Sequence, residues 1–142
     1  MSGHNPPTWT DLPDLASATV GGATLTCNDE FFAEKENLLK PEDAVWKEHV
    51  YTDRGKWMDG WETRRFRPTD GVAPGPESDI HDWCVIRLGL PGVIRGIVVD
   101  TAWFRGNYPA SAAIYATTVD DALDLRALDA ATWTEILPRS KP

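Results

Sequence analysis

Short apolar runs separated by turn-forming residues constrain this sequence more than any other feature. Runs rich in β-branched residues occur at 23–27, 83–88, 93–101, 111–118 and 132–137. Turn signals lie between the runs, and include Gly21-Gly22, Pro91-Gly92 and the sequence Gly106-Asn107-Tyr108-Pro109. Glycine and asparagine favour tight turns, and proline cannot continue a central strand. The pattern predicts an all-β sandwich, with Pro138 ending the last of these strands.

Two segments are compatible with short helices. Residues 30–40 precede Pro41, which should end a helix because the residue before proline avoids helical geometry. Residues 120–130 combine early acidic residues with three leucines. Residues 1–13 hold three prolines among polar residues, and predict a flexible lead-in. We therefore expect one domain over residues 14–142.

Charge and cysteine usage exclude several classes of protein. The formal net charge is −8 and no basic face is evident, which argues against nucleic-acid binding. No apolar stretch approaches the roughly 20 residues of a membrane span, and no secretory signal is evident. Cys27 and Cys84 form no C-x-x-C motif. These features predict a cytoplasmic protein with two free thiols.

A long, irregular, aromatic-rich segment at 41–82 is typical of a functional loop region. Within it, residues 53–65 alternate carboxylates, cations and indoles. Arg64 and Arg65 could bind a small anion, and Trp57 and Trp61 could exclude water from a pocket. The alternative is a solvated loop with surface ion pairs and tryptophan anchors, which composition alone favours.

Two smaller polar clusters are Asn28-Asp29-Glu30 and His81-Asp82. His81 oriented by Asp82 would suit a general base, although spacing alone favours a structural pair at a strand edge. The histidines show no H-x-H or H-E-x-x-H spacing, so no metal-binding motif is present. Both cysteines lie in or beside apolar runs, which favours buried thiols over nucleophiles.

These clusters together resemble the allantoicase family. The resemblance extends from about Asp14 to Pro138, and its most specific part runs from Tyr51 to Arg65. Asn28-Asp29-Glu30-Phe31-Phe32, His81-Asp82-Trp83 and Gly106-Asn107-Tyr108-Pro109 also match. The resemblance implies a jelly-roll β-sandwich of the galactose-binding-like type, and hydrolysis of allantoate to ureidoglycolate and urea in purine degradation.

The resemblance also implies how the chain relates to a whole allantoicase. Allantoicases carry two such repeats, and this sequence resembles the first. Further strands normally follow the segment that matches 132–138, so we expect a sheet without its last strands. An unpaired sheet edge invites association with another chain, and a homo-oligomer is one expectation.

The reaction requires an anchor for the substrate carboxylate, proton transfer to the departing urea, and delivery of water. We expect Arg64 or Arg65 to be the anchor. Candidate acids and bases are Glu30, Asp59, Glu62, His81 and Asp82. Candidate substrate contacts are Asn28, Asn107, Trp57 and Trp61. We expect no metal-ligating residues, while a need for a divalent cation such as manganese stays open. The alternatives are a non-catalytic ligand-binding sandwich and an inactive piece of a two-repeat allantoicase.

Overall fold

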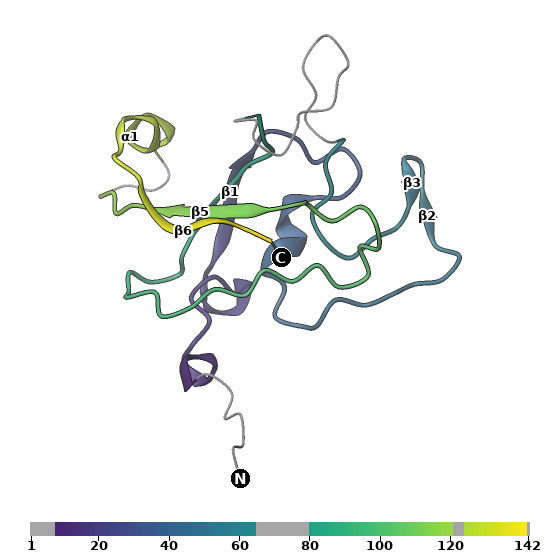
Figure 1. The fold of residues 1–142 in the computed structure, drawn as a ribbon, viewed down its shortest axis with the longest axis horizontal. Helices are drawn as coiled ribbons and strands as arrows, with labels where there is room; N and C mark the ends of the chain where they lie inside the picture. Colours follow the sequence, from purple (N-terminus) through teal and green to yellow (C-terminus); the bar gives the residue numbers. More distant parts are fainter. Residues whose placement is uncertain (1–7, 65–79, 121–123, 142) are drawn as a thin grey trace.

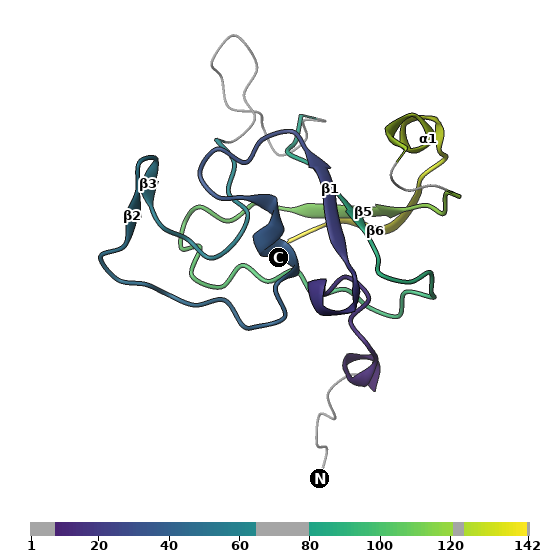
Figure 2. The ribbon, with the colours of Figure 1, turned by 180° about the vertical axis from the view of Figure 1, so that it is seen from behind.

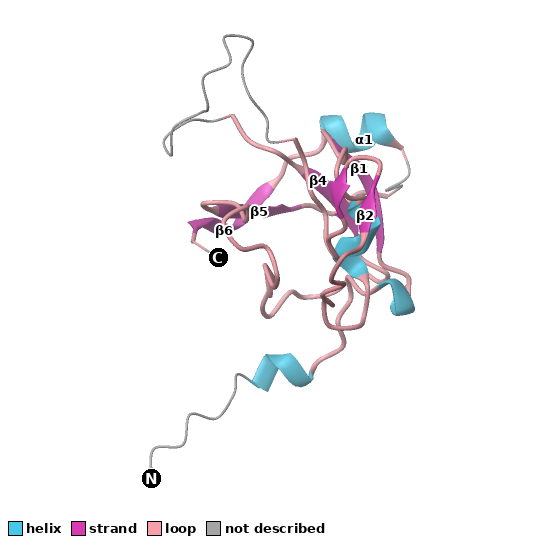
Figure 3. Ribbon diagram, turned by 90° about the vertical axis from the view of Figure 1, so that its right-hand side faces the viewer, coloured by secondary structure: helices cyan, strands magenta, loops and turns pink. Residues whose placement is uncertain are grey.

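The computed structural model describes residues 8–64, 80–120 and 124–141. These residues form three antiparallel two-stranded ribbons. The ribbons pair β1 (Ala23–Cys27) with β4 (Cys84–Arg87), β2 (Tyr51–Thr52) with β3 (Gly55–Lys56), and β5 (Ala112–Ala116) with β6 (Thr134–Ser140). The helical segments are the 3-10 turns η1 (Thr8–Asp11), η2 (Ala18–Val20) and η3 (Lys35–Leu39), and the short helix α1 (Leu125–Ala130). Regular structure is mostly strand, which agrees with the all-β prediction (Figure 3).

The two longer ribbons lie in different layers. The β5–β6 ribbon crosses in front of β1 in Figure 1, and β1 lies in front when the molecule is seen from behind (Figure 2). The side view separates β1 and β4 from β5 and β6 (Figure 3). The short β2–β3 hairpin projects on the opposite side of the molecule from α1 (Figure 1).

The end of the β1–β4 ribbon brings two of the polar clusters together. Cys27 lies opposite Cys84, and a register shift between Thr24 and Thr26 bends the ribbon. Beyond this pair, the backbone N–H of Asn28 donates to the carbonyl of Trp83 at 3.2 Å. Residues 28–30 therefore leave the ribbon beside residues 81–83, although more than fifty residues separate them in sequence.

The predicted strand at 93–101 is wrong. Residues 91–101 form no strand and are almost all exposed, with Val93 at 74% and Val98 at 71%. The sequence supplies β-branched residues there, but a strand also needs a hydrogen-bonded neighbour. Among the described residues, β4 pairs with β1 and β5 pairs with β6, so none pairs with this segment.

Two other predicted boundaries differ. The helix expected at 30–40 is only the 3-10 turn η3 at Lys35–Leu39, and the last strand does not end at Pro138. β6 continues through Pro138 to Ser140, because the irregular β5–β6 register pairs Leu137 with Ile114 and Ser140 with Ala112. A strand with only one paired edge tolerates the missing N–H of proline. The helix near 120–130 begins after Asp124, whose carboxylate accepts from the N–H of Arg126 at 2.9 Å.

The described residues enclose little core. Leu39, Met58 and Leu128 are the buried apolar side chains among them, while many large apolar side chains stay exposed. A self-contained domain of this size normally buries about two thirds of its unfolded surface. No helix in the described ranges is long and apolar enough to span a membrane.

Candidate functional site

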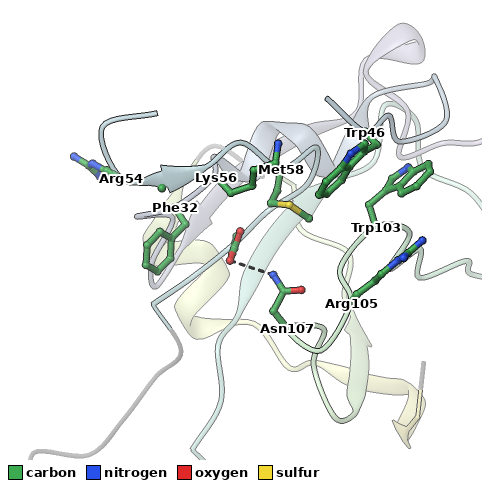
Figure 4. Close-up of a pocket in the computed structure, with 10 residues that line it drawn as sticks. Phe32, Trp46, Arg54, Lys56, Met58, Trp103, Arg105 and Asn107 are labelled. Atoms are coloured by element: carbon green, nitrogen blue, oxygen red, sulfur yellow. Dashed lines mark hydrogen bonds between the residues drawn. The ribbon is translucent and has the colours of Figure 1, made fainter. Parts of the chain in front are cut away.

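An open cleft of about 520 Å³ lies between the β2–β3 hairpin and the turn at 101–107 (Figure 4). It is lined by Phe32, Trp46, Arg54, Gly55, Lys56, Met58, Glu62, Trp103, Arg105 and Asn107. The lining combines aromatic and apolar walls, three cationic side chains, one carboxylate and one amide. Such a mixture of apolar walls and a few polar groups is typical of small-ligand sites.

Glu62 is fixed in the cleft by its backbone. Its N–H donates to the carbonyl of Ala33 at 3.1 Å, and its carbonyl accepts from the N–H groups of Phe32 and Ala33 at 3.2 Å. Oε1 of Glu62 accepts a hydrogen bond from Nδ2 of Asn107 at 3.3 Å, drawn as the dashed line in Figure 4. The carboxylate is therefore held from two directions, by its own bridge and by the 101–107 turn.

The three cationic side chains differ in how many contacts they already make with the rest of the protein. Arg54 stacks on the Phe31 ring at 4.3 Å and donates to the Phe31 carbonyl at 3.1 Å. Lys56 lies over the Trp46 ring at 4.5 Å and donates to the carbonyls of Lys47 and Val50. The guanidinium of Arg105, in contrast, makes no hydrogen bond or ion pair with any part of the chain that the structure describes. Arg105 is thus the lining cation best able to bind an incoming anion.

An indole pair forms one wall. The Trp46 and Trp103 ring centroids are 6.0 Å apart with a tilt of 33°, and Nε1 of Trp103 donates to the Ala44 carbonyl at 2.9 Å. Trp103 has a φ of 70°, a left-handed conformation that is rare for a bulky residue. Such a conformation persists only where surrounding contacts hold it.

The turn carrying Trp103, Arg105 and Asn107 packs closely on the opposite segment at Gly60. A Cβ at Gly60 would lie 2.6 Å from the Phe104 ring, closer than real contacts allow. Gly60 therefore permits the approach that places the turn beside Glu62. The turn itself includes Gly106, whose φ of 81° suits glycine.

A polar network lies at the end of the β1–β4 ribbon. Asp82 accepts from Nδ2 of Asn28 at 2.7 Å and from the hydroxyl of Thr63 at 2.9 Å, one bond to each carboxylate oxygen. The side-chain oxygen of Asn28 accepts from the Trp83 N–H at 2.9 Å. These bonds join three distant parts of the sequence and hold residues 61–64 against the ribbon.

Asp29 and Arg64 form the second half of this network. Arg64 donates to Oδ1 of Asp29 from Nε at 3.1 Å and from Nη2 at 2.7 Å, and its backbone N–H donates to Oδ2 at 2.7 Å. Burial alone would raise the pKa of Asp29, but the hydrogen bonds from Arg64 and Phe31 outweigh it and hold the pKa below its usual value. Trp61 donates from Nε1 to the Asp29 carbonyl at 2.8 Å. Arg64 is thus committed to an internal carboxylate.

The comparison with known families shows which family the chain matches. The family model described as the allantoicase repeat matches residues 13–142. The chain belongs to the allantoicase repeat family.

Named relatives agree with this assignment. The repeat is 46% identical over 134 residues to a probable allantoicase of Streptomyces coelicolor, covering 93% of this chain and 36% of the relative. It is 44% identical over 131 residues to the allantoicase of Dictyostelium discoideum, covering 92% of this chain and 32% of the relative. The chain thus spans about a third of the length of these curated relatives.

Solved allantoicase structures share the fold. The crystal structure of the Saccharomyces cerevisiae allantoicase superposes with a TM-score of 0.64 at 27% identity, over 92% of this chain and 35% of that one. A second allantoicase structure gives a TM-score of 0.65 at 27% identity, over 91% of this chain and 35% of the other.

Two of the residues predicted from the sequence, Glu62 and Asn107, line the cleft of this allantoicase repeat together. The other predicted residues within the described ranges do not line it. They are Asn28, Glu30, Trp57, Asp59, Trp61, Arg64, His81 and Asp82. Arg65 lies outside the described residues.

Several of those residues have structural partners. Asn28 and Asp82 bind each other, Arg64 binds Asp29, and Lys35 donates to Glu30 from its backbone at 3.1 Å and its ammonium at 3.4 Å. The Trp57 ring lies 4.4 Å from the Lys47 ammonium. Asp59 is bound by Lys40 and Val45.

Sequence reasoning missed most of the cleft lining. The aromatic and cationic members were not among the predicted site residues. They are Phe32, Trp46, Arg54, Lys56, Trp103 and Arg105. The available signal was the closeness of Trp103 and Arg105 to the Gly106–Pro109 turn, which carries the predicted Asn107. Trp46 gives no such signal, because only folding brings it to Trp103.

Both cysteines are free, as predicted. Burial raises the pKa of the Cys84 thiol to about 11 and raises that of Cys27 to a lesser degree, with Glu30 adding to the effect at Cys27. Thiols with raised pKa values are poor nucleophiles at neutral pH. Within the described ranges, no three His, Cys, Asp or Glu side chains are grouped so that they could hold a metal ion.

Proposed function

We propose that this repeat binds allantoate in the cleft and hydrolyses it to ureidoglycolate and urea. The observation that carries the proposal is the pairing of Glu62 with Asn107 in the same cleft as the guanidinium of Arg105, in a chain of the allantoicase repeat family. Allantoate is a small anion with two ureido groups. A cleft with one available guanidinium, one carboxylate and one amide matches those groups in charge and hydrogen-bonding capacity.

In this proposal Arg105 anchors the substrate carboxylate, since a guanidinium can donate two parallel hydrogen bonds to it. Arg54 and Lys56 add positive charge at the rim, which favours an anionic substrate. Trp46, Trp103 and Met58 supply the apolar walls beside the carbon that reacts. Arg105 thereby takes the role that the sequence assigned to Arg64 or Arg65.

Glu62 performs the proton transfers. It accepts a proton from water while the water oxygen bonds to the central carbon, and the bond from that carbon to one ureido nitrogen breaks. Glu62 then gives the same proton to the departing nitrogen, so that urea leaves neutral and the carbon keeps a hydroxyl group. Asn107 orients Glu62 through its hydrogen bond to Oε1.

The proposal also covers the type of fold, the cellular compartment and the oligomeric state. We propose that residues 14–142 form one repeat of a jelly-roll sandwich of the galactose-binding-like type. Its support is the pair of antiparallel ribbons in two layers. Two free thiols suit a reducing compartment, and we propose the cytoplasm. The exposed apolar residues of 93–99 support association of copies into a homo-oligomer.

The test is urea release from allantoate by the purified chain, with and without manganese and after chelation, together with its solution mass. Steady turnover that is lost in Glu62→Gln supports the proposal. A folded chain that binds allantoate without turning it over supports a binding sandwich instead. A folded chain that neither binds nor hydrolyses allantoate overturns the assignment of this cleft.

A further inference from the structure

Asp59 does not line the cleft, and both of its carboxylate oxygens are bound by other groups of the protein. Its side chain is 10% exposed. Oδ2 accepts from the backbone N–H of Val45 at 2.9 Å, and Oδ1 accepts from the Lys40 ammonium at 3.1 Å. Both oxygens therefore bind groups of the 40–45 segment.

The segment held by Asp59 carries one side of the indole wall. On one side of Val45, the carbonyl of Ala44 accepts from Nε1 of Trp103 at 2.9 Å. On the other side, the Trp46 ring lies against that of Trp103, with centroids 6.0 Å apart and a tilt of 33°. Both contacts to Trp103 thus come from the immediate neighbours of the one backbone N–H that Asp59 binds.

Around Val45 this segment has no regular structure to fix it. Residues 41–50 form no helix or strand, so their backbone has no ladder of hydrogen bonds. The other contacts that hold the segment come from the β3 side, where Trp57 and Lys56 donate to carbonyls at 47 and 50 and Lys56 lies over the Trp46 ring. Trp103 is in a left-handed conformation that its surroundings must maintain. A hydrogen bond to an ionised carboxylate that is largely shielded from solvent is stronger than one between neutral groups, and is well suited to this role.

The ionisation of Asp59 agrees with a fixed anchor. Burial would raise its pKa, but the hydrogen bonds from Val45 and Lys40 outweigh burial and lower the pKa below its usual value. A carboxylate with a lowered pKa stays charged at neutral pH and is a poor proton donor.

We propose that Asp59 is a positioning residue, which builds the Trp46–Trp103 wall of the cleft by fixing the backbone of Val45. It does not transfer protons. The kinetic part of this inference rests on the proposed function, whereas the structural part can be tested without turnover.

The structural test uses the coupling between two neighbouring indoles, which contributes an exciton couplet to the circular dichroism spectrum. Trp103→Phe gives the spectrum without that contribution. Asp59→Ala removes the acceptor for the Val45 N–H and should lose most of the couplet. Asp59→Asn keeps an acceptor oxygen and should retain it. Asp43→Ala is the matched control, since it removes an exposed carboxylate of the same segment whose side chain makes no described hydrogen bond.

The kinetic test separates positioning from proton transfer. We expect Asp59→Ala to raise KM for allantoate roughly tenfold with a smaller change in kcat, and Asp59→Asn to stay near the parent in both. A couplet that survives in a folded Asp59→Ala chain overturns the inference. An intact couplet with abolished kcat in Asp59→Asn also overturns it, and this variant decides alone if Asp59→Ala does not fold. If the parent itself shows no turnover, the proposed function fails while the spectra still decide the role of Asp59.

Discussion

Nδ2 of Asn107 donates a hydrogen bond to Oε1 of Glu62 across 3.3 Å, and this bond joins segments 45 residues apart. It connects the 101–107 turn to the residue that is bridged to Ala33. The carboxylate, the uncommitted guanidinium of Arg105 and the Trp103 ring therefore share one cleft. The proposed chemistry depends on this convergence.

Glu62→Gln should abolish proton transfer while keeping the shape of the side chain. The amide can still bond to Asn107, but it cannot accept a proton from water. We expect kcat for allantoate to fall by about a hundredfold or more, since general acid–base catalysis contributes roughly 10²–10⁴ in rate. Urea release measures the effect, with Glu48→Gln as the control at an exposed site. Undiminished turnover in the Glu62→Gln variant would show that Glu62 does not transfer the proton.

Arg105→Met should weaken substrate binding. Losing a charge-assisted hydrogen bond costs about 1.5–3 kcal/mol, so KM should rise about 10- to 100-fold. Arg95→Met, which changes an exposed arginine outside the lining, should leave KM unchanged. An equal effect of both substitutions would indicate general electrostatic attraction and not a specific anchor.

Gly60→Ala should destabilise the fold through the Phe104 ring, because the new Cβ would lie 2.6 Å from it. Overpacking of this kind costs about 1–3 kcal/mol in the free energy of unfolding. In a Phe104→Ala background the same change should cost less than about 0.5 kcal/mol. Urea denaturation of the parent, Gly60→Ala, Phe104→Ala and the double variant gives the coupling free energy between the two positions. Equal costs in both backgrounds would contradict the close approach.

Asp29→Asn should destabilise the fold at neutral pH, and should destabilise it less in acid. The folded-state pKa of Asp29 lies below its usual value of 3.8, so its contribution is fully present above that value and is lost as pH falls through the folded pKa. We expect a loss of about 1–3 kcal/mol at pH 7 from the hydrogen bonds of Arg64. Unfolding curves at pH 7 and pH 3 measure it. A destabilisation of the same size at both pH values would exclude the ionic origin.

Cys84 should react slowly with thiol reagents in the folded chain. With a pKa of about 11 its thiolate is scarce at pH 8, and alkylation should be slower than for an ordinary thiol by about a hundredfold. The Cys27→Ser chain isolates this thiol, and the same chain in urea gives the unhindered rate. Folded and unfolded rates that agree would show that the thiol is not shielded.

Local patterns in the sequence were sufficient to predict β1, β4, β5 and β6 and a helix within 120–130. Its start at Leu125, capped by Asp124, is seen only in the structure. Local patterns failed at 93–101, since β-branched residues mark a surface suited to a sheet but do not provide the neighbouring strand. They failed also at Pro138, where the register with β5 accommodates the missing donor.

By itself the sequence determined the family, through the motif between Tyr51 and Arg65, and the kinds of chemistry available. Only the tertiary structure decided which polar side chains remain available to a ligand. Arg64 and Arg105 have the same charge and the same chemistry. Arg64 is bound to Asp29, 35 residues away, whereas the guanidinium of Arg105 lines the cleft and binds none of the described residues. A local pattern specifies residue type and periodicity, but a partner far along the chain is chosen by the packing of the whole fold.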